Sequence, residues 1–327
     1  LSSAASDVYK RQMLWRRRNI DAATSSLKVG MWVGIVGMAM TFFTGHGSAV
    51  EVARCQPMKL AAMEGVYNGE VGQDLVAFGI LRPDAAATPD DPLLFHISIP
   101  KGLSYLINLR GDCFVPGIND LIDGRSITEE GDTVYCHSYA ERIANGKDAQ
   151  AALRRYTEAR EAGDSAAMAA ASGAVLERFD DFGYGYLESP QAAVPPVGMS
   201  FYSFHIMVLA GGLLFAVLLL MLFACYRKPD LLKKAWVLWL GMLSIALVWI
   251  CSQAGWVLAE VGRQPWVIQD LMPTGVAISA VPEGSVKFTF WMFAAIFTLL
   301  LIAEVSIMCR QISKASKTNL EPAVNLK

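Results

Sequence analysis

Charged residues are scarce in this chain. Only 18% of its 327 residues are Asp, Glu, Lys or Arg, whereas 54% are hydrophobic. The mean hydropathy of +0.35 is well above that of a soluble globular domain. The net charge is -2 and the basic residues occur in short dispersed groups, so no nucleic-acid surface is expected. The composition therefore favours an integral membrane protein.

Metal-binding spacings are also lacking. The six cysteines contain no C-x-x-C pair, and the four histidines form no neighbouring pair, so a zinc site is not expected. Cys113 and Cys136 could form a disulfide if their segment lies outside the cytoplasm, or remain free. The sequence leaves both possibilities open.

The first residues lack the features of a signal peptide. Residues 1–12 are polar, contain no apolar core and do not begin with methionine. They resemble read-through from a vector or adapter. We therefore expect residues 1–12 to be a non-native leader, and the chain to be a fragment that has lost its true beginning.

Four apolar runs have lengths near the ~20 residues that a membrane-spanning helix needs, the first being somewhat short. They are Val29–Thr44, Phe201–Tyr226, Ala235–Ala259 and Phe288–Cys309. They lack the alternation of barrel strands, and lipid-embedded backbone must otherwise be helical. We expect an all-α integral membrane fold: four transmembrane helices, with a long extracytoplasmic, largely helical loop between the first and second.

Basic residues flanking the spans predict the orientation. They cluster before the first span, between the second and third, and after the fourth, which places these segments and both chain ends in the cytoplasm. The expected organisation is a basic segment and first span (13–45), external loop (46–200), second span (201–226), cytoplasmic loop (227–234), third span (235–259), external loop (260–287), fourth span (288–309) and cytoplasmic tail (310–327).

The long external segment has two parts of different composition. Up to Gly124 it mixes proline, glycine, acids and short apolar runs, which favours turns with short strands or helices. Residues 139–182 are rich in Ala, Glu and Arg, and Gly163 with Asp164 interrupts them. This second part predicts two helices.

Polar groups gather where the third span ends, in the stretch GWVLAEVGRQPW at residues 255–266. Helical periodicity places Trp256, Glu260 and either Arg263 or Gln264 on one face. Glu260 could pair with Arg263, or Arg263 could instead bind an anion such as a haem propionate. Trp256 could equally be ordinary core packing.

Met207 and His205 lie in the first turns of the second span, in FYSFHIM. The orientation puts Met207 in the same leaflet as Glu260, and a thioether and a carboxylate are both possible ligands of haem iron, although methionines in apolar helices usually just pack. A histidine in a span is either functional or bonded to a backbone carbonyl. The stretch QPMKLAAMEG, with Lys59 and Glu64, has the composition of an ordinary amphipathic turn.

Four stretches of the chain together resemble subunit I of the cytochrome bd quinol oxidases. They are QPMKLAAMEG (56–65), GYGY (183–186), FYSFHIM (201–207) and GWVLAEVGRQPW (255–266), and their order and separation match the family. The resemblance covers nearly the whole chain. It implies a multi-pass enzyme of the bacterial cytoplasmic (inner) membrane that oxidises quinol and reduces dioxygen to water.

The resemblance also implies cofactors, partners and residue roles. The cofactors are a low-spin haem b, a high-spin haem b and haem d, and the partners are subunit II, small accessory subunits and membrane lipid. By position, Met207 matches the ligand of the low-spin haem iron, and Glu260 that of the high-spin haem iron. Trp256 and Arg263 match residues near the haems, and we assign both to the catalytic centre with Glu260. Lys59 and Glu64 match the quinol-binding pair, which replaces the interpretation from composition.

Two departures from the family pattern matter. Where the family usually has an arginine two residues before the methionine ligand, this chain has His205, a possible competing haem ligand. The family has nine spans, of which this chain matches the last four, and histidine ligands belong to the others. We therefore expect that this polypeptide alone would not assemble the three haems. The alternative function is a non-enzymatic membrane receptor with an extracytoplasmic ligand-binding segment.

Overall fold

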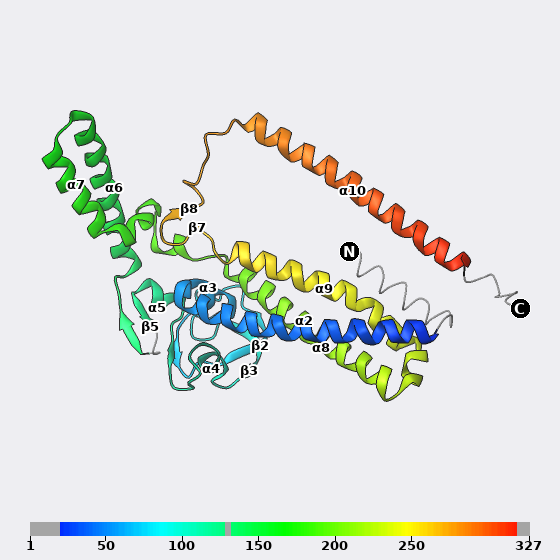
Figure 1. Cartoon of the computed structure of the whole chain (residues 1–327). Coiled ribbons are helices and arrows are strands. Elements are labelled where there is room, and N and C mark those ends of the chain that lie inside the picture. The colour runs from blue at the N-terminus through cyan, green and yellow to red at the C-terminus, as the bar shows by residue number, and fades with distance from the viewer. Residues whose placement is uncertain (1–19, 128–131, 319–327) are drawn as a thin grey trace, which may run out of the picture. The chain divides into compact units, whose positions relative to one another are not determined.

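The computed structural model describes residues 20–127 and 132–318. Within them, four helices are long and apolar enough to cross a membrane, as predicted. They are α2 (Ile20–Cys55), α8 (Val197–Tyr226), α9 (Ala235–Val261) and α10 (Glu283–Thr318), shown in Figure 1. The expected leader, 1–12, lies outside the described residues.

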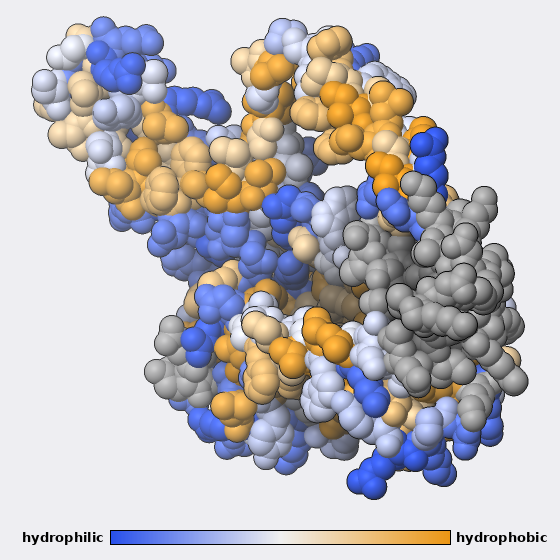
Figure 2. Space-filling model, turned by 45° about the vertical axis from the view of Figure 1, so that its right-hand side comes forward, coloured by the Kyte–Doolittle hydropathy of each residue, from blue (hydrophilic) through white to orange (hydrophobic). Residues whose placement is uncertain are grey.

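The helices extend beyond the apolar runs. α2 continues past Thr44 to Cys55, and α8 begins at Val197 rather than Phe201. Hydropathy marks the part of a helix that suits lipid, whereas backbone hydrogen bonding can continue into polar sequence beyond it. Figure 2 shows hydrophobic residues exposed in broad patches, as expected of surfaces that lipid or partner helices cover.

The chain forms two compact units, which are described separately. The larger comprises residues 34–217 and 246–278 and contains every candidate site residue. The smaller comprises the described parts of residues 1–33, 218–245 and 279–327. In the smaller unit, Lys28 Nζ lies 4.9 Å from the ring centroid of Tyr226, and Trp32 Nε1 donates to the Tyr226 hydroxyl at 3.3 Å. The beginning of α2 therefore lies beside the end of α8.

The first half of the segment between α2 and α8 is not largely helical. It contains three antiparallel two-stranded sheets as well as short helices. The pairs are β1 (Glu70–Val71) with β4 (Phe114–Val115), β2 (Leu75–Leu81) with β3 (Leu93–Ile99), and β5 (Arg125–Ile127) with β6 (Thr133–Tyr135); the helices are α3 (Pro57–Glu64), α4 (Gly102–Asn108) and α5 (Ile118–Ile122). The all-α expectation is corrected accordingly: the chain is mostly helical with small sheets.

The second half of this segment contains the two predicted helices. They are α6 (Tyr139–Ala162) and α7 (Ser165–Glu177). Gly163 ends α6 with a φ of +72°, a left-handed conformation that glycine adopts without strain. The Asp164 carboxylate caps α7 by accepting from the backbone N–H groups of Ala166 and Ala167, each at 3.0 Å. The interruption read from the sequence is thus confirmed.

Three 3-10 helices and one further sheet complete the fold. They are η1 (Phe179–Tyr186), η2 (Pro190–Ala193), η3 (Pro229–Lys233), and the antiparallel pair β7 (Trp266–Ile268) and β8 (Met272–Pro273). η1 contains the GYGY stretch and packs closely on α6. A Cβ at Gly146 would lie 2.4 Å from the backbone nitrogen of Gly185, so this contact requires glycine.

Cys113 and Cys136 are both free, so the suggested disulfide is not formed. Cys113 is buried, and its thiol contacts the backbone oxygens of Ser104 and Arg110 at 3.5 and 3.4 Å. Cys136 is exposed. The buried thiol behaves as a small core residue.

Helix α3 lies between two clusters of buried apolar residues. Met58 and Ala61 belong to one cluster, which includes Trp266, whereas Leu60 and Met63 belong to the other, which includes Leu258. Because these four residues point to different sides of a short helix, α3 is enclosed on most of its circumference. This enclosure determines the surroundings of Lys59 and Glu64.

Candidate functional site

Glu64 is a buried acid at the end of α3. The helix begins at Pro57 and ends at Glu64, and it is capped by Gly65, whose φ of +71° lets its backbone N–H bond to the oxygen of Ala61. Glu64 is 1% exposed, and neither carboxylate oxygen has a hydrogen-bond partner. Burial raises the pKa of Glu64 from 4.5 to about 8. The side chain is therefore neutral below that pH and able to pair with a polar group of a ligand.

Lys59 lies against the end of α9. A Cβ at Gly262 would be 3.2 Å from Lys59 Cε and 3.3 Å from Cγ, so the lysine stem packs on the glycine backbone. Burial lowers the pKa of Lys59, as does nearby Arg263, whereas Glu260 acts in the opposite direction. Helical spacing places Lys59 and Glu64 about 140° apart around α3. Glu64 does not contribute to the pKa shift of Lys59, so the two form no ion pair.

Glu260 and Arg263 form an ion pair. Arg263 Nη2 lies 2.5 Å from Glu260 Oε2, and both side chains are half-exposed. Helix α9 ends at Val261, and Gln264 Nε2 donates to the backbone oxygen of Glu260 at 3.2 Å. Of the two possibilities open in the sequence, the described structure forms the pair.

Met207 faces α9 across a glycine. A Cβ at Gly255 would lie 3.0 Å from the Met207 sulfur, and the Cys251 thiol lies 3.4 Å from the Met207 backbone oxygen. Small residues thus let α8 and α9 approach at the level of this sulfur. Trp256, the neighbour of Gly255, is 62% exposed, so packing against the described residues does not account for it.

His205 is buried between two backbone carbonyls. It is 4% exposed, with Nδ1 2.8 Å from the oxygen of Phe201 and Nε2 2.9 Å from the oxygen of Val76. The Phe201 ring lies over it, with ring centroids 4.0 Å apart. This is the backbone-bonded arrangement that the sequence left open, and both ring nitrogens are engaged. A role for His205 as a haem ligand stays a prediction.

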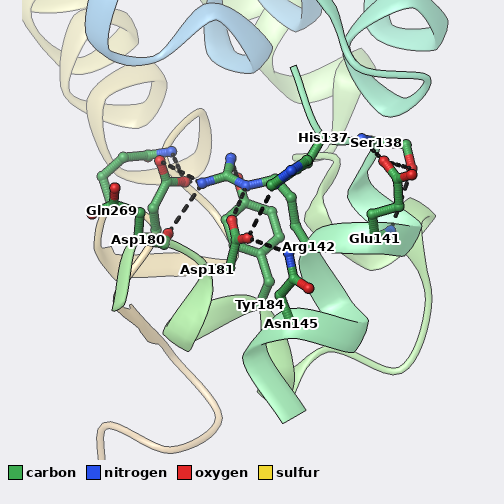
Figure 3. A network of polar contacts seen from close by, with 10 residues as sticks. His137, Ser138, Glu141, Arg142, Asn145, Asp180, Asp181, Tyr184 and Gln269 are labelled. Atoms are coloured by element: carbon green, nitrogen blue, oxygen red, sulfur yellow. Dashed lines mark hydrogen bonds and ion pairs between the residues drawn. The ribbon is translucent and has the colours of Figure 1, made fainter. Parts of the chain in front are cut away.

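A polar network that the sequence did not reveal is centred on Arg142 of α6. Figure 3 shows Asp181, Tyr184 and Asn145 converging with it. Arg142 Nε donates to Asp181 Oδ1 at 2.7 Å and Nη1 donates to the Tyr184 hydroxyl at 2.7 Å. Burial alone would raise the pKa of Asp181, but the bonds from Arg142 and Asn145 lower it below its ordinary value. The acid is therefore held ionised.

The same network reaches the GRQPW stretch. The Tyr184 hydroxyl donates to Asp270 Oδ1 at 2.8 Å, and the backbone N–H of Gly183 donates to the oxygen of Asp270 at 3.2 Å. The ring of Trp266 lies against Tyr184, with centroids 4.9 Å apart. Arg142 and η1 thus anchor the segment that follows Arg263.

Comparison with sequence families assigns the chain to a known family. The sequence profile of the family described as cytochrome bd terminal oxidase subunit I matches residues 4–316. The chain belongs to this family. The network around Arg142 and the convergence of Lys59, Glu260 and Arg263 all lie within the residues that the profile matches.

Individual proteins similar to this chain are also cytochrome bd subunits or bd oxidases. The chain is 33% identical over 320 residues to the cytochrome bd-II ubiquinol oxidase subunit 1 of Escherichia coli strain K12, covering 90% of this chain and 56% of the relative. It is 25% identical over 305 residues to the cytochrome bd ubiquinol oxidase subunit 1 of Bacillus subtilis strain 168, covering 93% and 52%. The solved bd oxidase of Geobacillus thermodenitrificans has the same fold, with a TM-score of 0.62, 21% identity, and coverage of 95% and 55%. The chain spans about half the length of these relatives.

The family implies haem, and this chain's donor set fits it in part. Met207 offers a thioether, a known axial ligand of haem iron, beside the space that Gly255 leaves. Glu260 offers a carboxylate. Within the described residues, no group of three or more His, Cys, Asp or Glu could hold a metal ion.

Replacing Arg142 with alanine is expected to loosen the attachment of the 266–274 segment. The change removes one charge-assisted bond to the nearly buried Asp181 carboxylate and another to the Tyr184 hydroxyl, at a cost of about 2–3 kcal/mol. Hydrogen exchange of the Gly183 amide, which bonds to Asp270, should accelerate, and the unfolding temperature in detergent should fall. Arg154→Ala on the exposed face of α6 is the matched control. Equal effects of the two variants would show that the network anchors nothing.

Proposed function

We propose that this chain is part of a terminal respiratory oxidase that oxidises quinol and reduces dioxygen to water. The observation that carries the proposal is the position of Lys59. Its stem packs on Gly262 and its charge lies beside the Glu260–Arg263 pair. The quinol-binding candidate and the haem-ligand candidate, more than 200 positions apart in the printed sequence, are thus neighbours.

Lys59 and Glu64 act on the quinol. Oxidation of a quinol to a quinone releases two protons and two electrons. The fraction of Glu64 that is ionised near neutral pH takes one of these two protons from a quinol hydroxyl, a role that its unpaired oxygens and its pKa of about 8 suit. The Lys59 ammonium stabilises negative charge that develops on a quinol oxygen. Burial of both side chains strengthens these interactions by excluding water.

The haem-binding residues are proposed from their chemistry and place. Met207 would hold the low-spin haem b through its sulfur and Glu260 would hold the high-spin haem b through its carboxylate, with haem d as the third haem. When bound, the haems accept the quinol electrons and reduce dioxygen. Arg263, which pairs with Glu260 in the structure, would turn to a haem propionate when haem is bound, and Trp256 would lie between haems that cover its exposed ring.

The oxidase is placed in the bacterial inner membrane with both ends of the chain in the cytoplasm. The contact between Lys28 and Tyr226 supports this, because it puts two basic flanks on one side. Subunit II, small accessory subunits, lipid, quinol and dioxygen are the partners. None of the relatives named above is a receptor, so the alternative has no comparable support.

A Lys59→Met variant of the membrane-bound oxidase tests the proposal. Methionine keeps an apolar stem on Gly262 but removes the charge, so the KM for quinol should rise about tenfold or more, the worth of one hydrogen bond to a charged group. Haem absorption should not change. Lys147→Met, on the exposed surface of α6, is the control.

Two results would overturn the proposed function. One is a parent protein with no quinol-dependent oxygen consumption, which would return the receptor alternative. The other is an unchanged KM in Lys59→Met, which would separate Lys59 from the quinol site.

A further inference from the structure

The β2–β3 hairpin is unusually apolar for a surface element. Neither strand contains a charged residue. Charges occur only at its two ends, where Asp74 accepts from the Ser98 hydroxyl at 3.0 Å and Arg82 pairs with Asp91 at 2.5 Å. The hairpin is therefore an apolar patch between two polar rims.

One face of the hairpin packs on α8. Val76 and Leu93 are buried with Phe201 in a small cluster. Gly79 lies on this face, since a Cβ there would be 3.2 Å from the Phe201 ring. This face of the hairpin is therefore covered by α8.

The opposite face is apolar and stays exposed among the residues that the structure describes. The register pairs Phe78 with Ile97 and Ile80 with Phe95, which places these four side chains on one face. Each is 40–57% exposed, and the Phe78 and Phe95 rings meet edge to face at 6.3 Å. A contiguous exposed patch of this kind marks a contact surface rather than scattered surface residues.

Two hydrogen bonds fix the level of the hairpin on α8. The Leu81 backbone N–H donates to the Tyr202 hydroxyl at 3.2 Å, and His205 Nε2 lies 2.9 Å from the oxygen of Val76. Tyr202 and His205 both belong to the apolar helix that could cross the membrane. Ile206, in the same turns, is also exposed. The hairpin is therefore held where α8 meets the membrane.

We propose that the face formed by Phe78, Ile80, Phe95 and Ile97 docks on the lipid bilayer, in its interfacial region. Helix α8, to which the hairpin is bonded, also exposes apolar side chains near these bonds, among them Ile206 and Val208. Aromatic side chains suit the boundary between headgroups and acyl chains. Unpaired backbone groups on the edges of a two-stranded sheet prevent deeper insertion. This proposal does not depend on the oxidase activity.

Spin-label accessibility tests the proposal on the whole membrane protein. Cysteine is introduced as Phe95→Cys, and separately as Ile97→Cys, after the exposed Cys55, Cys136 and Cys309 are changed to serine. The labelled protein is placed in nanodiscs of phosphatidylethanolamine and phosphatidylglycerol. Lipid-soluble oxygen should relax both labels more strongly than a water-soluble nickel chelate does. A label at Tyr135→Cys, an exposed aromatic position on β6, should show the reverse.

Two outcomes would overturn the proposal. If the nickel chelate relaxes the Phe95 and Ile97 labels as strongly as the Tyr135 label, the face lies in water. If both labels are immobile and shielded from both reagents, a protein surface covers the face instead of lipid. The use of two separate positions shows whether one substitution has merely disturbed the hairpin.

Discussion

Replacing Met207 with leucine in the membrane-bound oxidase is expected to abolish the low-spin b absorption and quinol oxidation together. Leucine fills nearly the same volume beside Gly255, so packing between α8 and α9 should survive. It has no sulfur lone pair, so the low-spin haem iron would lose the ligand that we propose for it. Removing only the residue that hydrogen-bonds to a metal ligand lowers metal affinity or activity about 10–100-fold. Removing the ligand itself should lower quinol oxidation by at least the upper end of that range.

Reduced-minus-oxidised spectra and quinol-dependent oxygen consumption measure this effect. Met221→Leu is the matched control, because Met221 is a fully buried methionine on the same helix. Its cost should stay below about 1.5 kcal/mol, with an unchanged spectrum. A normal low-spin signal in Met207→Leu would mean that Met207 only packs, which is the usual role of methionine in an apolar helix.

The membrane helices could be predicted because lipid imposes a simple rule. An apolar run near the length that a bilayer requires is helical unless it alternates like a barrel strand, and this rule located all four candidate spans of the described residues. It could not locate the helix ends, since α2 continues through Glu51 and Arg54 to Cys55 after the apolar run has finished. Hydropathy indicates whether a segment lies in lipid or in water, but not where its helical hydrogen bonding stops.

Local signals worked equally well where a single residue determines the backbone. Gly163 and Asp164 separate α6 from α7 because one tolerates a left-handed conformation and the other caps a helix. The β2–β3 pairing was harder to predict. Its strands are apolar on both faces, so they lack the alternation that distinguishes a strand from a buried helix.

Contacts between residues far apart in the sequence could not be predicted from the spacing of residues along the chain. Lys59 meets Gly262, and Arg142 meets Asp181 and Tyr184, only after distant segments fold together. Composition made the α3 segment look like an ordinary turn; its similarity to a family, rather than its residue pattern, indicated a site there. Burial of Glu64 likewise depends on two clusters that enclose α3 from different sides.

Replacing Glu64 with glutamine is expected to stabilise the protein at alkaline pH while removing quinol oxidation. Burial raises the pKa of Glu64 from 4.5 to about 8, so the folded state disfavours the ionised form. The penalty is absent below pH 4.5, grows between pH 4.5 and about 8, and is complete above that. At about 1.4 kcal/mol per pKa unit, the full penalty is about 5 kcal/mol. Glutamine has the same shape and does not ionise.

Unfolding temperatures in detergent across pH 5 to 9 give the measurement. The parent should lose stability as pH rises, relative to Glu64→Gln, and the two should be similar near pH 5. Glu188→Gln, an exposed acid, should leave the parent's pH dependence in place. Glutamine cannot accept a proton from quinol, so turnover should fall although stability rises, as expected where a destabilising group is kept for function. Parallel pH profiles of parent and Glu64→Gln would contradict the burial of an ionisable acid at this position.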